Sequence, residues 1–191
     1  MLSYVLLARL DSMTTPRLIF HPRDAQQTIP RESLVQSMRE IGFIAEGLAG
    51  HEGDCYAAGG HFIDLLSFLG CSPVINLSPE DGDKFCYIEL MDLPAAELIS
   101  GSQAFQPRCS QCRLPLPDWK RQLNTRSTIQ CHECMTEMSL EQVNWKQSAG
   151  YASQFMLVHN IYLHEAVPVE RLLMTLQAIS HNKAWNYFYV L

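Results

Sequence analysis

Cys109-Ser110-Gln111-Cys112 and Cys131-His132-Glu133-Cys134 are the two stretches that decide how this chain is organised. Each stretch has two residues between its cysteines, and 18 residues (113–130) separate the two stretches. Two intervening residues let both sulfurs of a tight turn point at one ion, and two such turns complete a tetrahedral four-sulfur site. The sequence therefore predicts a metal centre formed by Cys109, Cys112, Cys131 and Cys134.

Zinc is the metal that this ligand set favours, because thiolates at this spacing are common ligands of structural zinc. Four thiolates also suit iron, and a site without metal is the remaining alternative. A redox role is disfavoured for the first pair, because Pro115 and Pro117 follow it and prevent the helix on which a reactive pair sits. Four protein ligands leave no open position, so we expect a structural zinc that staples a short polar segment.

Residues 105–138 resemble the zinc-ribbon class of rubredoxin-like four-cysteine knuckles. The runs 105–109 and 128–131 are expected to enter the two turns as strands. Many knuckles of this class carry Pro inside the pair and Gly directly after it, whereas Arg113 and Met135 follow the pairs here. The resemblance implies the four-cysteine ligand set and concerns only this part of the chain.

The rest of the sequence predicts an α+β fold. Helices are expected over 30–41, 61–69 and 168–179, where apolar residues recur at helical spacing. Strands are expected over 17–20, 42–45, 74–77, 85–90, 155–162 and 185–190, which are rich in apolar, β-branched or aromatic residues. We therefore expect a mixed or antiparallel sheet with about three helices, interrupted by an inserted zinc ribbon. Residues 1–100 and 150–191 would form one α/β body, and residues 101–149 the inserted module.

Two finer expectations concern the α/β body. Turn residues in 78–83 predict an antiparallel hairpin between 74–77 and 85–90. Residues 29–41 and 167–179 share a pattern of Pro, Glu and apolar residues. That likeness indicates either two related strand–helix–strand halves, as in a ferredoxin-like sheet, or simply two amphipathic helices that begin with proline. His21 and His181 are interpreted as surface residues, and Trp185 as a core residue.

Composition excludes disorder and fibrous classes, because 47% of the 191 residues are hydrophobic and 18% are charged. Fourteen basic and 20 acidic residues give a net charge of -6, which disfavours a general attraction to nucleic acid or an anionic membrane. Seven cysteines, an odd number, are typical of a reduced compartment, so we expect a cytoplasmic protein with no membrane association. Residues 1–12 are either native or an upstream extension, with Met13 as the alternative start.

The segment around the cysteines is more basic than the chain as a whole. Its cations and one tryptophan form a candidate nucleic-acid face, consisting of Arg108, Arg113, Trp119, Lys120, Arg121 and Arg126. The alternative is a solvated hairpin whose charges keep it soluble.

A second cluster of reactive side chains lies between a predicted strand and a predicted helix. It consists of His51, Asp54, Cys55, His61 and Asp64, with Gly59 and Gly60 among them. Cys55 could act as a nucleophile with His51 or His61 as its base, or the glycines could cradle an anion. The alternative is an exposed polar loop.

The sequence thus favours a non-enzymatic zinc-binding protein whose ribbon is a structural staple and a contact surface for an unidentified protein. A nucleic-acid-binding ribbon protein and an enzyme with its site near His51–Asp64 are the alternatives. A homodimer is a further alternative, because sheet edges and apolar termini are good pairing surfaces.

Overall fold

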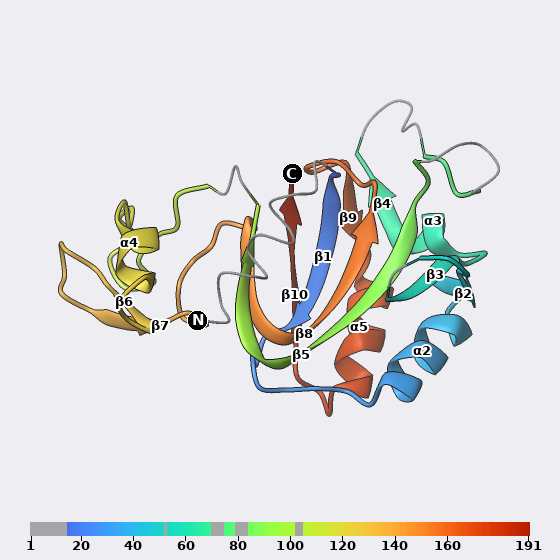
Figure 1. Cartoon of the computed structure of the whole chain (residues 1–191), viewed down its shortest axis with the longest axis horizontal. Helices are drawn as coiled ribbons and strands as arrows, with labels where there is room; N and C mark the ends of the chain where they lie inside the picture. The colour runs from blue at the N-terminus through green and yellow to red at the C-terminus, as the bar shows by residue number, and fades with distance from the viewer. Residues whose placement is uncertain (1–14, 52, 70–74, 79–83, 102–104) are drawn as a thin grey trace.

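A six-stranded antiparallel sheet forms the centre of the molecule (Figure 1). The computed structural model describes residues 15–51, 53–69, 75–78, 84–101 and 105–191. The strand order of the large sheet is β10-β1-β8-β5-β3-β2, and every neighbouring pair is antiparallel. Its strands are β1 (Arg17–Pro22), β2 (Ile44–Gly47), β3 (Asp54–Ala58), β5 (Tyr87–Ser100), β8 (Ala149–His159) and β10 (Trp185–Val190). Two small sheets pair β4 (Leu66–Phe68) with β9 (Ala166–Pro168) and β6 (Thr128–Gln130) with β7 (Glu137–Ser139).

Helices α2 (Arg31–Glu40) and α5 (Glu170–Ile179) cover one face of the large sheet (Figure 1). The described part also contains two short helices, α3 (Phe62–Leu65) and α4 (Trp119–Leu123). Helices α2 and α5 contact each other and bury apolar residues spaced four apart, Leu34 and Met38 on α2 and Leu172 and Leu176 on α5. These side chains join the main hydrophobic core between the helices and the sheet. The fold is therefore α+β, as predicted.

The opposite face of the sheet has a smaller core of its own, built from Ile19, Phe155, Leu157 and Phe188 with their neighbours. Successive strand residues point to opposite faces, so β8 supplies apolar side chains to both cores. His21 lies among these residues and is only 7% exposed, so its interpretation as a surface residue is wrong. His181 is exposed and Trp185 is buried, as expected.

The segment with the four cysteines is inserted between β5 and β8. These two strands pair from Ile88↔Val158 to Ser100↔Ala149, with an irregularity between Asp92 and Glu97. Ser100 and Ala149 lie opposite each other, so the chain leaves and re-enters the sheet at one place. Figure 1 shows the inserted segment, with α4, β6 and β7, projecting from this end of the sheet and away from α2 and α5.

The helix predicted over 61–69 is too long. Helix α3 covers only Phe62–Leu65, and Leu66 has the extended backbone of the next strand. Strand β4 pairs with β9, so the inter-strand hydrogen bonds outweigh the helical spacing of the apolar residues. Leu69, which the helical pattern placed on the buried face, is 60% exposed.

The hairpin predicted between 74–77 and 85–90 is wrong within the described residues. Residues 75–77 are not a strand, and β5 pairs instead with β3 on one side and β8 on the other. These two neighbours leave no free edge of β5 for residues 75–77. That segment is instead held by a 2.7 Å hydrogen bond, which the N–H of Cys86 donates to the carbonyl of Asn76. Residue 74 and the turn residues 79–83 lie outside the described residues.

The likeness between 29–41 and 167–179 does not extend to the surrounding sheet. Strands β1 and β2, on either side of α2, lie in the large sheet with three strands between them, whereas α5 follows β9 of a separate two-stranded sheet and precedes β10. The two segments thus share an amphipathic helix but not a repeated sheet unit. None of the helices in the described ranges combines the length and apolar character needed to cross a membrane.

Candidate metal centre

The two cysteine pairs form turns with the same backbone hydrogen bonds. In the first turn, the N–H of Cys109 donates to the carbonyl of Leu114 at 2.9 Å, and the N–H of Arg113 donates to the carbonyl of Cys109 at 3.0 Å. The N–H groups of Cys131 and Met135 make the corresponding bonds of the second turn, also at 2.9 and 3.0 Å. Both pairs of sulfurs are therefore presented by the same local backbone.

The residue after each pair has a left-handed backbone. Arg113 has a φ of 63° and Met135 a φ of 59°. An L-residue in this region is strained by about 1–2 kcal/mol, a strain that glycine avoids. The turns therefore keep the conformation in which many knuckles of the resembled class use Gly, although this chain has bulkier residues there.

The four sulfur atoms of Cys109, Cys112, Cys131 and Cys134 lie within 4.8 Å of one another. Two of their separations are 3.6 Å, one between Cys109 and Cys134 and one between Cys112 and Cys131. A tetrahedron with metal–sulfur bonds of about 2.3 Å has sulfur–sulfur edges of about 3.8 Å. The donor set and its spacing therefore fit one four-coordinate ion.

Two thiols of this cluster have pKa values that are shifted in opposite directions. Hydrogen bonds from the hydroxyl and backbone of Thr136 lower the pKa of Cys134 to about 6. For Cys112, a backbone hydrogen bond with Leu114 acts to lower the pKa, but partial desolvation and the neighbouring sulfurs outweigh it and raise the pKa to about 12. The Cys134 thiol thus ionises at a lower pH than the Cys112 thiol. A metal ion binds thiolates, so its binding would release the remaining thiol protons to solvent.

The inserted segment has a hydrophobic core of its own, next to the cysteines. Trp119 and Trp145 contact edge to face with ring centroids 5.2 Å apart, and Ile129 and Met138 of β6 and β7 are fully buried beside them. The indole N–H of Trp145 donates to the carbonyl of Leu140 at 2.8 Å. The strand predicted over 128–131 is found as β6, whereas Arg108 is the only described residue of 105–109 with strand-like pairing.

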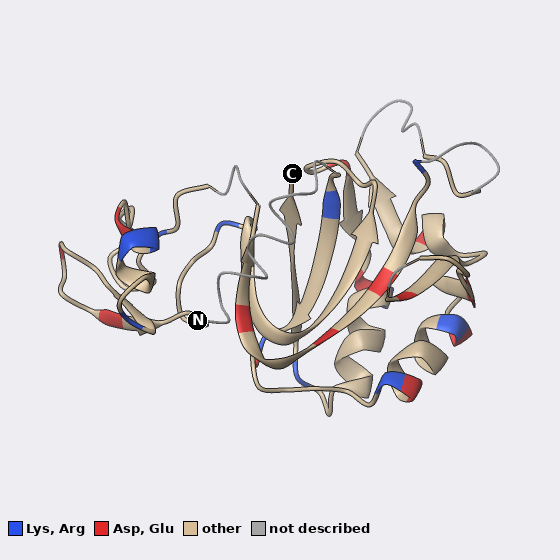
Figure 2. Ribbon diagram, in the orientation of Figure 1, with Lys and Arg blue, Asp and Glu red and all other residues tan. Residues whose placement is uncertain are grey.

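Basic residues of this segment include Lys120 and Arg121 on α4, where the ribbon of Figure 2 is blue. Trp119 does not share their surface, because it is 6% exposed and its ring is covered by Trp145 and the ammonium group of Lys120. Its indole is therefore not free to stack on a base. Arg121 pairs with Asp118, and Arg108 donates to the carbonyl of Arg113. Nucleic-acid binding by these cations stays a prediction, without Trp119 as a stacking platform.

The residues of the second candidate cluster are divided among separate contacts. The Cys55 thiol is buried on β3, and burial, with the nearby charges of Glu89 and Asp54, raises its pKa to about 11. The thiol is therefore protonated at neutral pH and is a poor nucleophile. Exposed His61 pairs with exposed Asp64 at 3.0 Å, while Asp54 forms an ion pair with Arg31. His51 packs against the ring of Tyr87.

A buried polar network that the sequence did not reveal lies on the same sheet face as His21. The Nε of Arg17 donates to Nδ1 of His159 at 3.3 Å, and Nε2 of His159 lies 2.8 Å from the carboxylate of Glu89. Tyr87 stacks on the His159 ring at 4.1 Å. Burial lowers the pKa of His159, although the bond to Glu89 acts in the opposite direction. Alternation along three strands could have placed these residues on one face, but only with the strand order known.

Comparisons of the chain with models of known protein families, with curated proteins and with solved structures found no match. The fold and the sulfur cluster therefore define the class on their own. This chain is an α+β protein with a six-stranded antiparallel sheet and, inserted between two of its strands, a four-cysteine cluster that could hold a metal ion.

Proposed function

We propose that this chain is a non-enzymatic zinc-binding protein of the cytoplasm, whose four-cysteine ribbon is a structural staple and a contact surface for a partner protein. The observation that carries the proposal is the four-sulfur cluster, with separations close to those of a tetrahedral zinc site. Four thiolates complete the coordination of zinc, so no position is left for a substrate or a reacting water. The reduced cysteines that such a site requires are typical of the cytoplasm.

The zinc would stabilise a segment whose own core is small. Among the described residues, nine buried ones make up this core; two of them are cysteines of the cluster and one, Ala149, belongs to β8. A core of this size supplies little stability alone, and structural zinc commonly provides the rest. In this arrangement the ion holds the two turns together and allows Trp119 and Trp145 to pack between them.

Exposed apolar side chains at the turns support the contact role. Met135 is 62% exposed and directly follows the second cysteine pair, and Leu114 is 44% exposed and lies two residues after the first pair, next to Arg113. Exposed apolar side chains held in turns next to charged residues suit a protein partner with an apolar surface of its own. No comparable pattern on the ribbon favours an enzyme.

Elemental analysis of the purified chain, with thiol titration, tests the zinc. We expect one zinc per chain, with the four cluster thiols unreactive until a chelator is added and all seven thiols reactive after denaturation with chelator. Iron in place of zinc, or oxidised cysteine pairs without metal, would overturn this part of the proposal. Sedimentation of the same sample tests the expected homodimer.

Exchange of the exposed apolar residues tests the contact role. Met135→Lys and Leu114→Lys should keep the zinc and abolish co-purification of a stoichiometric partner. Met174→Lys is the matched control, because Met174 is 61% exposed on α5, away from the ribbon. A partner that is lost equally from all three variants, or from none, would contradict a contact surface on the ribbon.

A further inference from the structure

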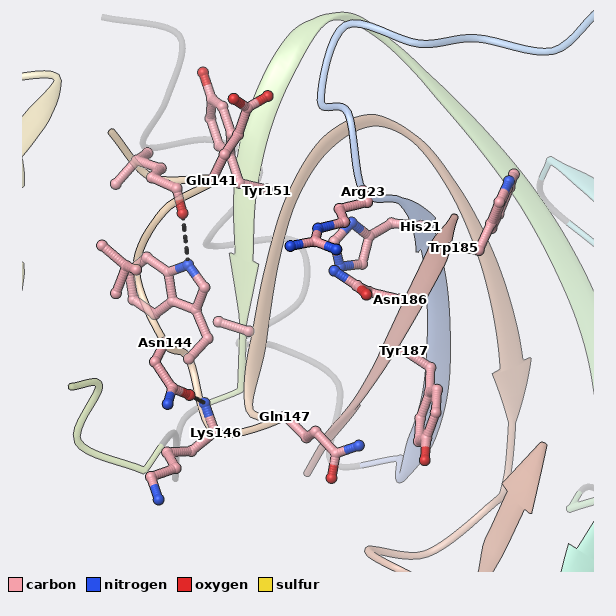
Figure 3. Close-up of a pocket in the computed structure, with 14 residues that line it drawn as sticks. His21, Arg23, Glu141, Asn144, Lys146, Gln147, Tyr151, Trp185, Asn186 and Tyr187 are labelled. Atoms are coloured by element: carbon pink, nitrogen blue, oxygen red, sulfur yellow. Dashed lines mark hydrogen bonds between the residues drawn. The ribbon is translucent and has the colours of Figure 1, made fainter. Parts of the chain in front are cut away.

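A cavity of about 270 Å³ lies where the inserted segment returns to the sheet (Figure 3). One wall is the chain from Leu140 to Tyr151, which leaves the ribbon and begins β8. The other wall is formed by the end of β1 and the start of β10, with His21, Arg23 and Asn186. None of the four cysteines lines this cavity, so it is distinct from the metal centre.

His21 contributes a buried hydrogen-bond acceptor to the cavity. Its Nδ1 lies 2.8 Å from the carbonyl of Pro22, and because a carbonyl only accepts, Nδ1 carries the proton. Burial lowers the pKa of His21 to about 4, so the ring is neutral at pH 7 and Nε2 has a free lone pair. Nε2 forms no hydrogen bond within the described ranges of the chain. Phe155 and Phe188 pack against the ring and hold it in place.

Cations without partners lie at the exposed part of the cavity. Figure 3 shows the guanidinium group of Arg23 beside His21 and Asn186. The side chains of Arg23, Lys146 and Asn186 form no hydrogen bond or ion pair with any residue that the structure describes. Among the described residues that line the cavity, Glu141 is the one carboxylate, and it accepts a hydrogen bond from the backbone N–H of Ala25 at 2.8 Å. The described lining, with Arg23, Lys146 and Glu141, therefore carries one net positive charge in a chain whose net charge is -6.

The turn that presents Lys146 is strained and firmly held. Lys146 and Gln147 both have a φ of 54°, a left-handed conformation that L-residues rarely adopt. The carbonyl of Gln147 accepts a hydrogen bond from Tyr189 of β10 at 3.1 Å, and the side chain of Asn144 accepts one from the N–H of Lys146. Strain that is held by such bonds is typical of binding sites. Trp145, Tyr151, Trp185 and Tyr187 add aromatic surface to the cavity.

We propose that this cavity binds a small planar organic carboxylate that also has a hydroxyl or N–H group. The carboxylate pairs with Arg23 beside Asn186, and the hydroxyl or N–H donates to Nε2 of His21. A single net positive charge matches a carboxylate better than a phosphate, which carries close to two negative charges at pH 7. The cavity volume equals that of about nine water molecules, enough for an aromatic acid of one ring.

Titration calorimetry on the full-length, zinc-loaded chain tests the proposal with 4-hydroxybenzoate as the probe. We expect a dissociation constant of about 1 mM or lower. Benzoate lacks the donor and should bind several-fold more weakly, and phenol lacks the carboxylate and should bind more weakly still. Arg23→Gln should lower the affinity for 4-hydroxybenzoate about tenfold. Arg126→Gln, the same change at an exposed arginine of the ribbon, should leave this affinity unchanged.

His21→Phe separates the role of Nε2 from that of the ring. This change keeps an aromatic ring between Phe155 and Phe188, and it should lower 4-hydroxybenzoate affinity to that of benzoate while leaving benzoate itself unaffected. If this variant does not fold, the comparison of Arg23→Gln with Arg126→Gln still decides the question. Absence of binding by 4-hydroxybenzoate, tighter binding of phenyl phosphate than of benzoate, or equal losses in the two arginine variants would overturn the proposal.

Discussion

Arg113 and Met135 occupy the same position in the two cysteine turns, one residue beyond each pair, and both have left-handed backbones with φ values of 63° and 59°. Each donates its N–H to the carbonyl of the first cysteine of its pair at 3.0 Å. The two residues differ in size, charge and chemistry, so their common conformation is imposed by the turn and not by the side chains. The metal centre therefore stores backbone strain at two equivalent places.

Glycine at either position should relieve that strain. We expect Met135→Gly to raise the free energy of unfolding of the zinc-loaded protein by up to about 1 kcal/mol, because the left-handed cost exceeds the extra chain entropy of glycine. Met135→Ala is the control, since it removes the same side chain and keeps the cost. The measurement is chemical denaturation with zinc in excess, and equal stabilities of the two variants would contradict the strain.

Loss of one cysteine should uncouple the ribbon from the sheet. Cys131→Ser removes a fully buried ligand, so we expect loss of zinc and of the packing between Trp119 and Trp145. The main core contains Trp185 and should survive, because its residues come from the sheet and from α2 and α5. In the Trp185→Phe variant, the remaining tryptophans, Trp119 and Trp145, report by fluorescence on the ribbon. In the Trp119→Phe, Trp145→Phe double variant, Trp185 reports on the sheet. If the ribbon and the sheet unfold in one transition, the predicted division at residues 101–149 is wrong.

We expect Trp119 to stabilise the ribbon and not to bind nucleic acid directly. Its side chain is 6% exposed at the centre of the ribbon core, so Trp119→Ala should destabilise the ribbon by about 3–5 kcal/mol. If the ribbon binds single-stranded nucleic acid, Lys120→Gln and Arg126→Gln should weaken that binding and reduce its salt dependence without destabilising the fold. Fluorescence anisotropy with a labelled oligonucleotide, read beside thermal unfolding, separates the two effects. A stable Trp119→Ala variant with reduced binding would reverse this assignment.

Acid should destabilise the protein through its buried histidines. The folded-state pKa of His21 is about 4, below the ordinary value of 6.5, because burial disfavours the charged ring. Below pH 6.5 the unfolded chain binds a proton that the folded chain does not, so the free energy of unfolding falls as the pH drops towards 4. The full effect is about 3 kcal/mol, and above pH 6.5 it is absent. Burial of His159 acts in the same direction.

Replacement of His21 should reduce this acid sensitivity. His21→Phe should show a shallower decline in the free energy of unfolding between pH 6.5 and pH 4 than the wild-type protein. His181→Gln, which removes an exposed histidine, is the control and should retain the wild-type decline. Any loss of zinc in acid affects all three proteins, so only the difference between them is used. Identical declines in all three would contradict the burial of a neutral His21.

The local sequence pattern was sufficient to predict part of the fold and the sulfur cluster. Spacing of Leu34, Met38, Leu172 and Leu176 predicted α2 and α5, and spacing of the cysteines predicted the cluster, because both depend on residues close in sequence. The helix over 61–69 was overestimated because pairing of β4 with β9 depends on residues about a hundred positions away. The network of Arg17, Glu89 and His159, and the cavity beside His21, likewise depend on strand order, which no local pattern specifies.

The pairing of Ser100 with Ala149 has an evolutionary consequence. Residues opposite each other in antiparallel strands are about 5 Å apart, a gap that a two-residue hairpin loop closes. The sheet of this chain is therefore compatible with an ancestor that had a plain β-turn where the ribbon now stands. Acquisition of the ribbon would have required no change in strand order, only a longer connection with a hydrophobic core beside its four cysteines.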